Sequence, residues 1–225
     1  PSFITNAITQ AIVPPISQAY ASKRFDRIHS HLDNAFQLSF LPSGIYTVLL
    51  MLFPVELMNL LFDSSTGANY LIVMAPVFLL LYFQAPLTST LQAIDEATQA
   101  MSTTLISSVI KIIMMIILLQ IPSLNIYGLV IAVLFNVVFV TAWHYLLVRK
   151  HIAYHMNMRS VINAILIIAV TFMLGSYLKL AVVFSTDSFL NMIMISFIVG
   201  IAYLFLLFIC GLFPTGKMAD TLRSK

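Results

Sequence analysis

The sequence predicts an all-α, polytopic membrane protein. Sixty per cent of its 225 residues are hydrophobic and only 8% are charged, and the mean hydropathy is +1.00. A soluble domain carries about 25% charged residues, which coat the surface that faces water. These values exclude a soluble globular enzyme, a disordered segment and a nucleic-acid-binding module. The single cysteine, Cys210, also excludes a disulfide framework and a paired-cysteine metal or redox site.

Long apolar runs follow one another along the chain, and a spanning helix needs about 20 such residues. The runs are continuous, unlike the short alternating segments of a membrane β-barrel. We therefore expect seven transmembrane helices, over residues 2–20, 35–62, 70–93, 101–119, 126–148, 161–184 and 188–213. The run over 35–62 is long enough to tilt in the bilayer or to extend beyond it.

Positive charge is distributed unevenly among the segments between these runs. Nine of the eleven lysines and arginines lie between the first two runs, between the fifth and sixth, or after the seventh. Positively charged loops stay in the cytoplasm, so we expect residue 1 outside the cell and the C-terminus in the cytoplasm. Trp143 and Tyr145 stand near the cytoplasmic end of the fifth run, where an aromatic belt is expected.

Polar side chains recur at helical spacing inside several runs. Gln84, Thr88 and Gln92 repeat every four residues in the third run and share one helix face. Similar rows occur in the first and fourth runs, made of Ser2, Asn6, Thr9 and Gln10, and of Thr104, Ser107 or Ser108, and Lys111. Two interpretations are open, hydrogen bonding between helices or the lining of a water-filled cavity. For the rows of Gln84 and Lys111 we favour the cavity.

Lys111 is the most informative single residue. It lies near the centre of its run, where a lysine costs about 2.5–3.5 kcal/mol, and no acidic residue lies at the centre of any run. Glu56 is the acid closest to being buried. Lys111 could meet an acid outside this chain or an anionic ligand, or it could extend along its helix to the cytoplasmic interface. Lys179 is nearer a run end, and we expect it to extend to the interface.

The histidines carry no convincing metal or catalytic pattern. His29, His31 and Asp33 are scattered around a helix by their spacing, and His151 and His155 lack the glutamate of a zinc protease motif. We expect both groups to be solvated in cytoplasmic loops. The runs also contain no nucleophile elbow, phosphate-binding loop or carboxylate pair. The sequence therefore predicts no catalytic residue, no metal site, no cofactor and no enzyme activity.

Three segments resemble a known transporter family. Residues 13–21 (VPPISQAYA) are similar to the VPAISEAYA segment of stage V sporulation protein B-like transporters. Residues 54–62 (PVELMNLLF) resemble the family's PIMNLLF segment. Lys111 followed by residues 121–128 (IPSLNIYG) is similar to the family's stretch of a lysine followed by IP and IYG. These transporters form a branch of the multidrug/oligosaccharidyl-lipid/polysaccharide flippase superfamily. Gln18 replaces the family's usual glutamate, and residues 94–99 replace a turn that commonly carries glycine and lysine.

The resemblance implies a two-lobed transporter of the MATE and lipid II flippase type, of which this chain is the C-terminal part. The chain begins at Pro1 with no positively charged segment before the first run, so we expect earlier helices to be missing. Residues 1–148 would be five helices of the second lobe, without its first helix. Residues 149–225 would be two additional peripheral helices and a cytoplasmic tail.

The implied activity is the flipping of undecaprenyl-pyrophosphate-linked saccharide, either lipid II or a polysaccharide repeat unit, across the bacterial cytoplasmic membrane. The expected partners are this lipid-linked substrate, membrane lipids and the missing lobe, but no nucleic acid. The expected substrate-binding residues are Lys111, Asn6, Gln10, Gln84, Thr88 and Thr104. The alternatives are a cation-coupled multidrug exporter, which would need an acid in a span, and a non-transporting membrane assembly protein.

Overall fold

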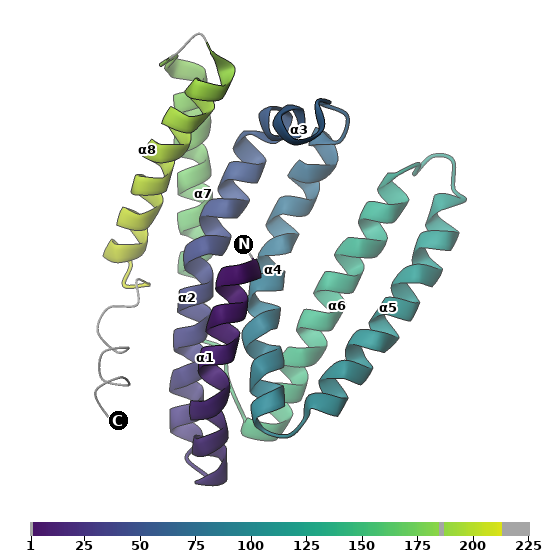
Figure 1. Cartoon of the computed structure of the whole chain (residues 1–225), viewed down its shortest axis with the longest axis vertical. Coiled ribbons are helices and arrows are strands. Elements are labelled where there is room, and N and C mark those ends of the chain that lie inside the picture. The colour runs from purple at the N-terminus through teal and green to yellow at the C-terminus, as the bar shows by residue number, and fades with distance from the viewer. Residues whose placement is uncertain (1, 185–186, 213–225) are drawn as a thin grey trace. The chain divides into compact units, whose positions relative to one another are not determined.

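A computed structural model describes residues 2–184 and 187–212, with side chains from Gln10 onward except that of Phe78. Within these residues every regular element is a helix, which confirms the all-α prediction (Figure 1). The eight helices are α1 (Ser2–Ala21), α2 (Phe25–Leu52), α3 (Pro54–Phe62), α4 (Ala68–Ala93), α5 (Ala97–Leu119), α6 (Tyr127–Ile152), α7 (Met158–Ala181) and α8 (Ser188–Ile209). Six of them, α2 and α4 to α8, are long and apolar enough to cross a membrane.

The run expected as one helix over residues 35–62 is divided in the structure. It starts earlier, at Phe25, and it breaks between Leu52 and Pro54. Proline has no N–H and disfavours helical dihedrals in the residue before it, and Phe53 accordingly has φ −124° and ψ 43°. Pro54 then occupies the first position of α3, which suits its fixed φ. The chain turns sharply here: in Figure 1, α3 is seen nearly end-on beside the end of α2.

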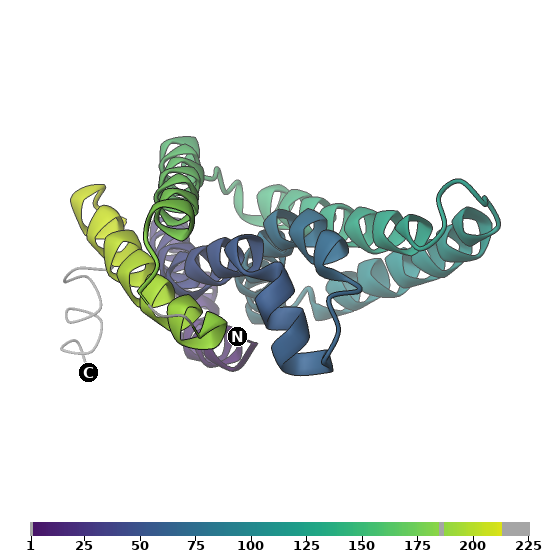
Figure 2. The same ribbon diagram turned by 90° about the horizontal axis from the view of Figure 1, so that it is seen from above.

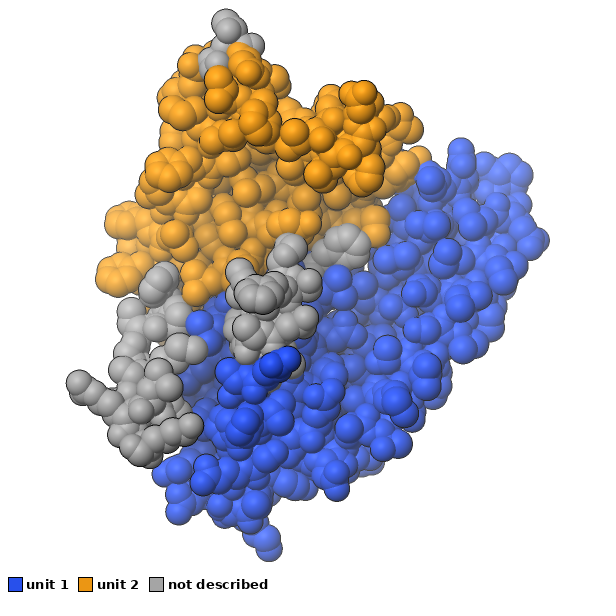
Figure 3. All heavy atoms as spheres, in the orientation of Figure 1, with its two compact units in different colours: residues 1–39, 76–156 blue, residues 40–75, 157–225 orange. Residues whose placement is uncertain are grey.

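The structure divides into two compact units, coloured in Figure 3. Unit 1 comprises residues 1–39 and 76–156, which include α1, the first part of α2, most of α4, and the α5–α6 pair. Its fully buried side chains include Ile16, Ile28, Leu32, Leu87 and Leu91. Figure 2 shows α5 and α6 side by side as an antiparallel pair joined by a short turn. Unit 1 therefore carries all of the predicted substrate-binding residues.

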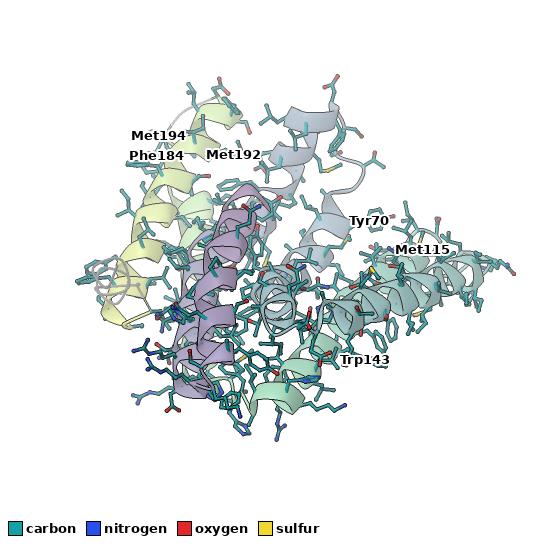
Figure 4. All side chains as sticks on the ribbon, turned by 60° about the horizontal axis from the view of Figure 1, so that its bottom comes forward. Tyr70, Met115, Trp143, Phe184, Met192 and Met194 are labelled. Atoms are coloured by element: carbon teal, nitrogen blue, oxygen red, sulfur yellow. The ribbon has the colours of Figure 1, made fainter. Side chains whose placement is uncertain are left out.

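Unit 2 comprises residues 40–75 and 157–225, of which the structure describes the helical parts of α2, α3, α4, α7 and α8. Its core is a cluster of Val48, Leu52, Phe53, Met192, Ile195 and Val199. Met192, labelled in Figure 4, lies on α8. Apolar side chains from α2, α7 and α8 thus pack together in this unit. The predicted helices over 161–184 and 188–213 correspond to α7 and α8.

Two glycines bring the helices of unit 2 into close approach. A methyl group at Gly44 would lie 2.1 Å from the hydroxyl oxygen of Tyr203, and one at Gly175 would lie 2.3 Å from Leu52. The Tyr203 hydroxyl donates a hydrogen bond to the Phe40 carbonyl at 2.6 Å. The absence of a side chain at Gly44 therefore gives the buried tyrosine ring its space on α2.

Candidate functional site

The polar row on α4 meets a histidine from α6. The Thr88 hydroxyl oxygen lies 2.9 Å from the Gln84 carbonyl and 3.2 Å from Nδ1 of His144. Gln84 and Thr88 are half-buried, whereas Gln92, at the end of the row, is exposed. Thr88 therefore fits the interpretation of hydrogen bonding between helices. Gln84 and Gln92 retain exposed surface, as residues that line a cavity do.

His144 is a residue that the sequence analysis missed. Its side chain is only 1% exposed, and its Nε2 lies 3.2 Å from the Ala100 carbonyl in the first turn of α5. The available signal was an ionisable residue inside an apolar run, where such residues are rare and usually functional. It was overlooked because Trp143 and Tyr145, on either side of it, indicated a membrane-interface belt.

The polar row on α5 is split between two environments. The Ser107 hydroxyl is fully buried and donates to Oδ1 of Asn136 on α6 at 2.6 Å. Thr104 is exposed, and its hydroxyl donates to the Ala100 carbonyl within its own helix at 3.0 Å. Ser107 therefore serves as the interhelical contact of the row, whereas Thr104 does not.

Lys111 lies one turn beyond Ser107 on α5 and is half-buried. Its neighbours Ile112 and Ile113 are exposed, as is most of the outer surface of α5. Among the described residues no hydrogen bond or ion pair engages the Lys111 ammonium group. The structure therefore places a cation in a candidate span without an acidic partner in this part of the chain.

The remaining predicted binding residues lie in the first run. Gln10 is exposed, and no hydrogen bond joins it to Gln84 or Thr88 in the described part of the chain. The side chain of Asn6 lies outside the described residues. The structure thus brings together Gln84 and Thr88, with His144 as their neighbour, and leaves the roles of Asn6, Gln10 and Thr104 as predictions.

The second lysine inside a candidate span has partners in unit 2. The Lys179 ammonium nitrogen lies 2.7 Å from Oε1 of Glu56 and 2.7 Å from the Leu52 carbonyl. It also lies 4.9 Å from the centre of the Phe53 ring. The sequence analysis did not predict these partners of Lys179. Pro54 ends α2 and frees carbonyls at its last turn, and Lys179 satisfies one of them.

Two of the four histidines expected in solvated loops make contacts within unit 1, whereas His155 is exposed as expected. His29 donates from Nε2 to the Ile152 carbonyl at 2.8 Å, and His151 pairs with Glu96 at 3.3 Å. The carbonyls at the end of α6 have no helical partners, so a donor from α2 satisfies one of them. In the described residues, no group of three or more potential ligands could hold a metal ion.

Tyr154 makes a further contact with α2 at the same end of α6. Its ring is buried, and its hydroxyl donates to Asp33 on α2. Burial first, and then the hydrogen bond to Asp33, raise the pKa of Tyr154 above the usual tyrosine range. The His29, Asp33 and Tyr154 contacts therefore hold α2 against the end of α6.

Comparisons with known proteins agree with this architecture. Residues 2–117 match the MatE family model. The chain is 34% identical to stage V sporulation protein B of Bacillus subtilis (strain 168) over 192 residues, covering 85% of this chain and 37% of that protein. It is 27% identical to sporulation protein YkvU of the same organism over 151 residues, covering 67% of this chain and 34% of that protein. No solved structure matches the chain significantly.

The chain spans about a third of the length of the curated relatives it matches. The family match covers α1 to α5 almost completely, and therefore includes the polar rows of α4 and α5. Together with the long apolar helices, these matches define a multi-pass membrane protein of a transporter family. The chain belongs to the MatE family, within the stage V sporulation protein B-like branch of the multidrug/oligosaccharidyl-lipid/polysaccharide flippase superfamily.

Proposed function

We propose that the chain is the C-terminal part of a flippase that moves undecaprenyl-pyrophosphate-linked saccharide across the cytoplasmic membrane by alternating access. The saccharide would be that of lipid II or of a polysaccharide repeat unit. The observation that carries this proposal is Lys111, a half-buried cation in a candidate span with no acidic partner among the described residues.

A lysine at this position needs water, an acid or an anionic ligand, because its insertion costs about 2.5–3.5 kcal/mol. A pyrophosphate group supplies concentrated negative charge, and lysine is a compact point charge that binds phosphate without strict geometry. An anionic head group that binds transiently near Lys111 would therefore compensate the positive charge of the lysine during translocation. Gln84 and Thr88 offer amide and hydroxyl groups for the sugar, and Asn6, Gln10 and Thr104 would extend the path.

The lipid tail would remain in the bilayer beside apolar helices. Much of the surface of α7 and α8 is apolar and exposed, with Leu180 at 88% and Phe197 at 70%. These helices fit the role of the additional peripheral pair, following the second-lobe helices of residues 1–148. The C-terminal tail would lie in the cytoplasm, following the positive loops.

A cation-coupled multidrug exporter would need an acidic residue available inside a span. Glu56 is the acid closest to that description, and it is paired with Lys179. This pairing disfavours the exporter, because the carboxylate already has a cation at 2.7 Å. A non-transporting assembly protein would tolerate the loss of Lys111 and Gln84.

The test is substitution of Lys111 in the full-length protein, followed by measurement of lipid-linked saccharide translocation in proteoliposomes. We expect Lys111→Gln and Lys111→Ala to slow translocation about tenfold or more, corresponding to about 1.4 kcal/mol, and Lys111→Arg to retain most of the rate. Lys150→Gln removes an exposed cation at the end of α6 and is the matched control. Wild-type rates in the Lys111 variants, at normal protein levels, would contradict the proposed role.

A further inference from the structure

His144 is a buried ionisable group of unit 1 that the proposed function does not use. It lies in α6, a candidate span, and its side chain is 1% exposed. Its two ring nitrogens face two different helices, with Ala100 of α5 at Nε2 and Thr88 of α4 at Nδ1. Thr88 belongs to the row that we assign to the head-group path, so the histidine has direct access to that row.

The hydrogen atoms around the ring can be assigned from the partners. The Ala100 carbonyl can only accept, so Nε2 of His144 must carry a hydrogen. Nδ1 of the neutral ring then accepts the single hydrogen of the Thr88 hydroxyl. The Gln84 carbonyl still receives the helical N–H of residue 88, so no group in this state lacks a partner.

Adding a proton to Nδ1 reverses only one of these hydrogen bonds, the one between Nδ1 and the Thr88 hydroxyl. The Nδ1–H group donates to the Thr88 oxygen, and the Thr88 hydroxyl turns its own hydrogen toward the Gln84 carbonyl at 2.9 Å. Every heavy atom keeps its position, and every polar group again has a partner. The site therefore accommodates both protonation states through rotation of one hydroxyl group.

Charged groups lie near His144 but do not contact it in the described residues. On α5, Glu96 lies one turn before Ala100 and is paired with His151, two turns along α6 from His144. The cations of the two helices are Lys111 on α5, and Arg149 and Lys150 on α6, which lie between one and two turns from His144. The titratable Tyr145 is the next residue on α6. The α4 segment Ala68–Ala93 contains no charged residue, and its titratable groups are Tyr70 and Tyr82.

We propose that His144 is a proton-binding site of the transporter, and that its protonation strengthens binding of the anionic head group beside Gln84 and Thr88. The proposal rests on the proposed function for the identity of that ligand. Protonation adds a positive charge next to the row and engages one acceptor site of the Thr88 oxygen. The added charge favours the anionic head group, and by linkage the bound head group favours the proton equally.

The experiment uses the full-length protein with His144→Gln, because the glutamine amide can still donate to the Ala100 carbonyl but cannot titrate. His155→Gln removes an exposed histidine and is the matched control. The first measurement is nitrogen NMR of labelled histidines between about pH 4 and pH 8, a range that brackets the usual histidine value. The second is binding of undecaprenyl-pyrophosphate-linked saccharide over the same range.

We expect a titrating histidine signal that is present in the wild type and in His155→Gln but missing from His144→Gln. Binding in the wild type and in His155→Gln should strengthen about tenfold toward acid pH, and binding in His144→Gln should not change with pH. A His144 signal that does not titrate overturns the proposal. A wild-type pH dependence that persists in His144→Gln also overturns it.

Failure of the proposed function gives a different result. A wild-type protein that binds no lipid-linked saccharide at any pH contradicts that function, while a titrating His144 signal still supports the proton site. If His144→Gln does not fold, Thr88→Ala retains the histidine and removes the acceptor of its Nδ1–H. The midpoint of the His144 titration should then move to lower pH, and an unchanged midpoint overturns the proposal.

Discussion

The polar side chains of the α4–α6 segment and those of the α7–α8 hairpin differ in their hydrogen-bond partners. On α4 to α6, two bonds between helices join side chains, Ser107 with Asn136 and Thr88 with His144. His144 also bonds to the Ala100 carbonyl. Lys179 of α7 and Tyr203 of α8 bond to backbone carbonyls of α2, at Leu52 and at Phe40. Lys179 also pairs with the Glu56 side chain. Both segments belong to one chain, but each makes these contacts within its own unit.

This difference separates an adaptable region from a fixed one. A bond between two side chains can exchange partners by rotation, and the Lys111 ammonium group has no ion-pair partner among the described residues. A bond from a side chain to a helix carbonyl holds two helices at one distance, and Gly44 and Gly175 add close approach to it. We therefore expect substitutions in unit 2 to affect stability, and substitutions on α4 to α6 to affect translocation.

A large stability effect should come from Gly44. In Gly44→Ala the new methyl group would overlap the Tyr203 hydroxyl, which lies 2.1 Å from its position. Overpacking of this kind costs about 1–3 kcal/mol, measured as the free energy of unfolding of the purified full-length protein in detergent. Gly200→Ala is the matched control on α8, because no atom lies within 4 Å of its new methyl group. Equal stabilities of the two variants would show that Tyr203 does not occupy the space at Gly44.

The two lysines of the candidate spans should give opposite results. Lys179→Gln should lower the free energy of unfolding by about 1.5–3 kcal/mol, because Oε1 of Glu56 loses its cation and the Leu52 carbonyl loses its donor. Translocation per folded molecule should change little. Lys111→Gln should slow translocation and leave stability nearly unchanged. Comparable losses of stability in both variants would remove the distinction between the regions.

The smallest effect should be the coupling between Ser107 and Asn136. A double-mutant cycle with Ser107→Ala and Asn136→Ala should give a coupling energy of about 0.6 kcal/mol, the average for hydrogen bonds between membrane helices. Ser108→Ala in place of Ser107→Ala is the control, because the Ser108 hydroxyl bonds to the Thr104 carbonyl of its own helix. Unfolding in a denaturing detergent provides the free energies, and equal coupling in the two cycles would refute a specific contact.

Much of the fold could be predicted from hydropathy, because about 20 apolar residues define a spanning helix without tertiary information. The break before Pro54 could not. Pro42, Pro76 and Pro86 lie inside helices that continue, so proline alone does not identify the break. The contacts that stabilise it come from Lys179, which lies 127 residues from Leu52 in the sequence.

The candidate site was predictable to a similar degree. Hydropathy and spacing identified Lys111 and the row of Gln84 and Thr88, since both signals are local. The partner of Thr88 could not be identified, because His144 lies 56 residues away in the sequence. The role of Ser107 as an interhelical donor also depended on the position of Asn136 on the next helix. Partner identity is a property of helix packing rather than of helix periodicity.

The turn between α5 and α6 has a consequence for membrane insertion. A methyl group at Gly128 would lie 2.8 Å from the backbone of Leu118, so the two helices meet closely where the short turn joins them. A hairpin closed at this end can enter the bilayer as one unit, with the Ser107 hydroxyl already donating to Asn136. The Ser107 hydroxyl and Oδ1 of Asn136 then cross the hydrocarbon region as a bonded pair, so the cost of inserting α5 and α6 is lower together than separately.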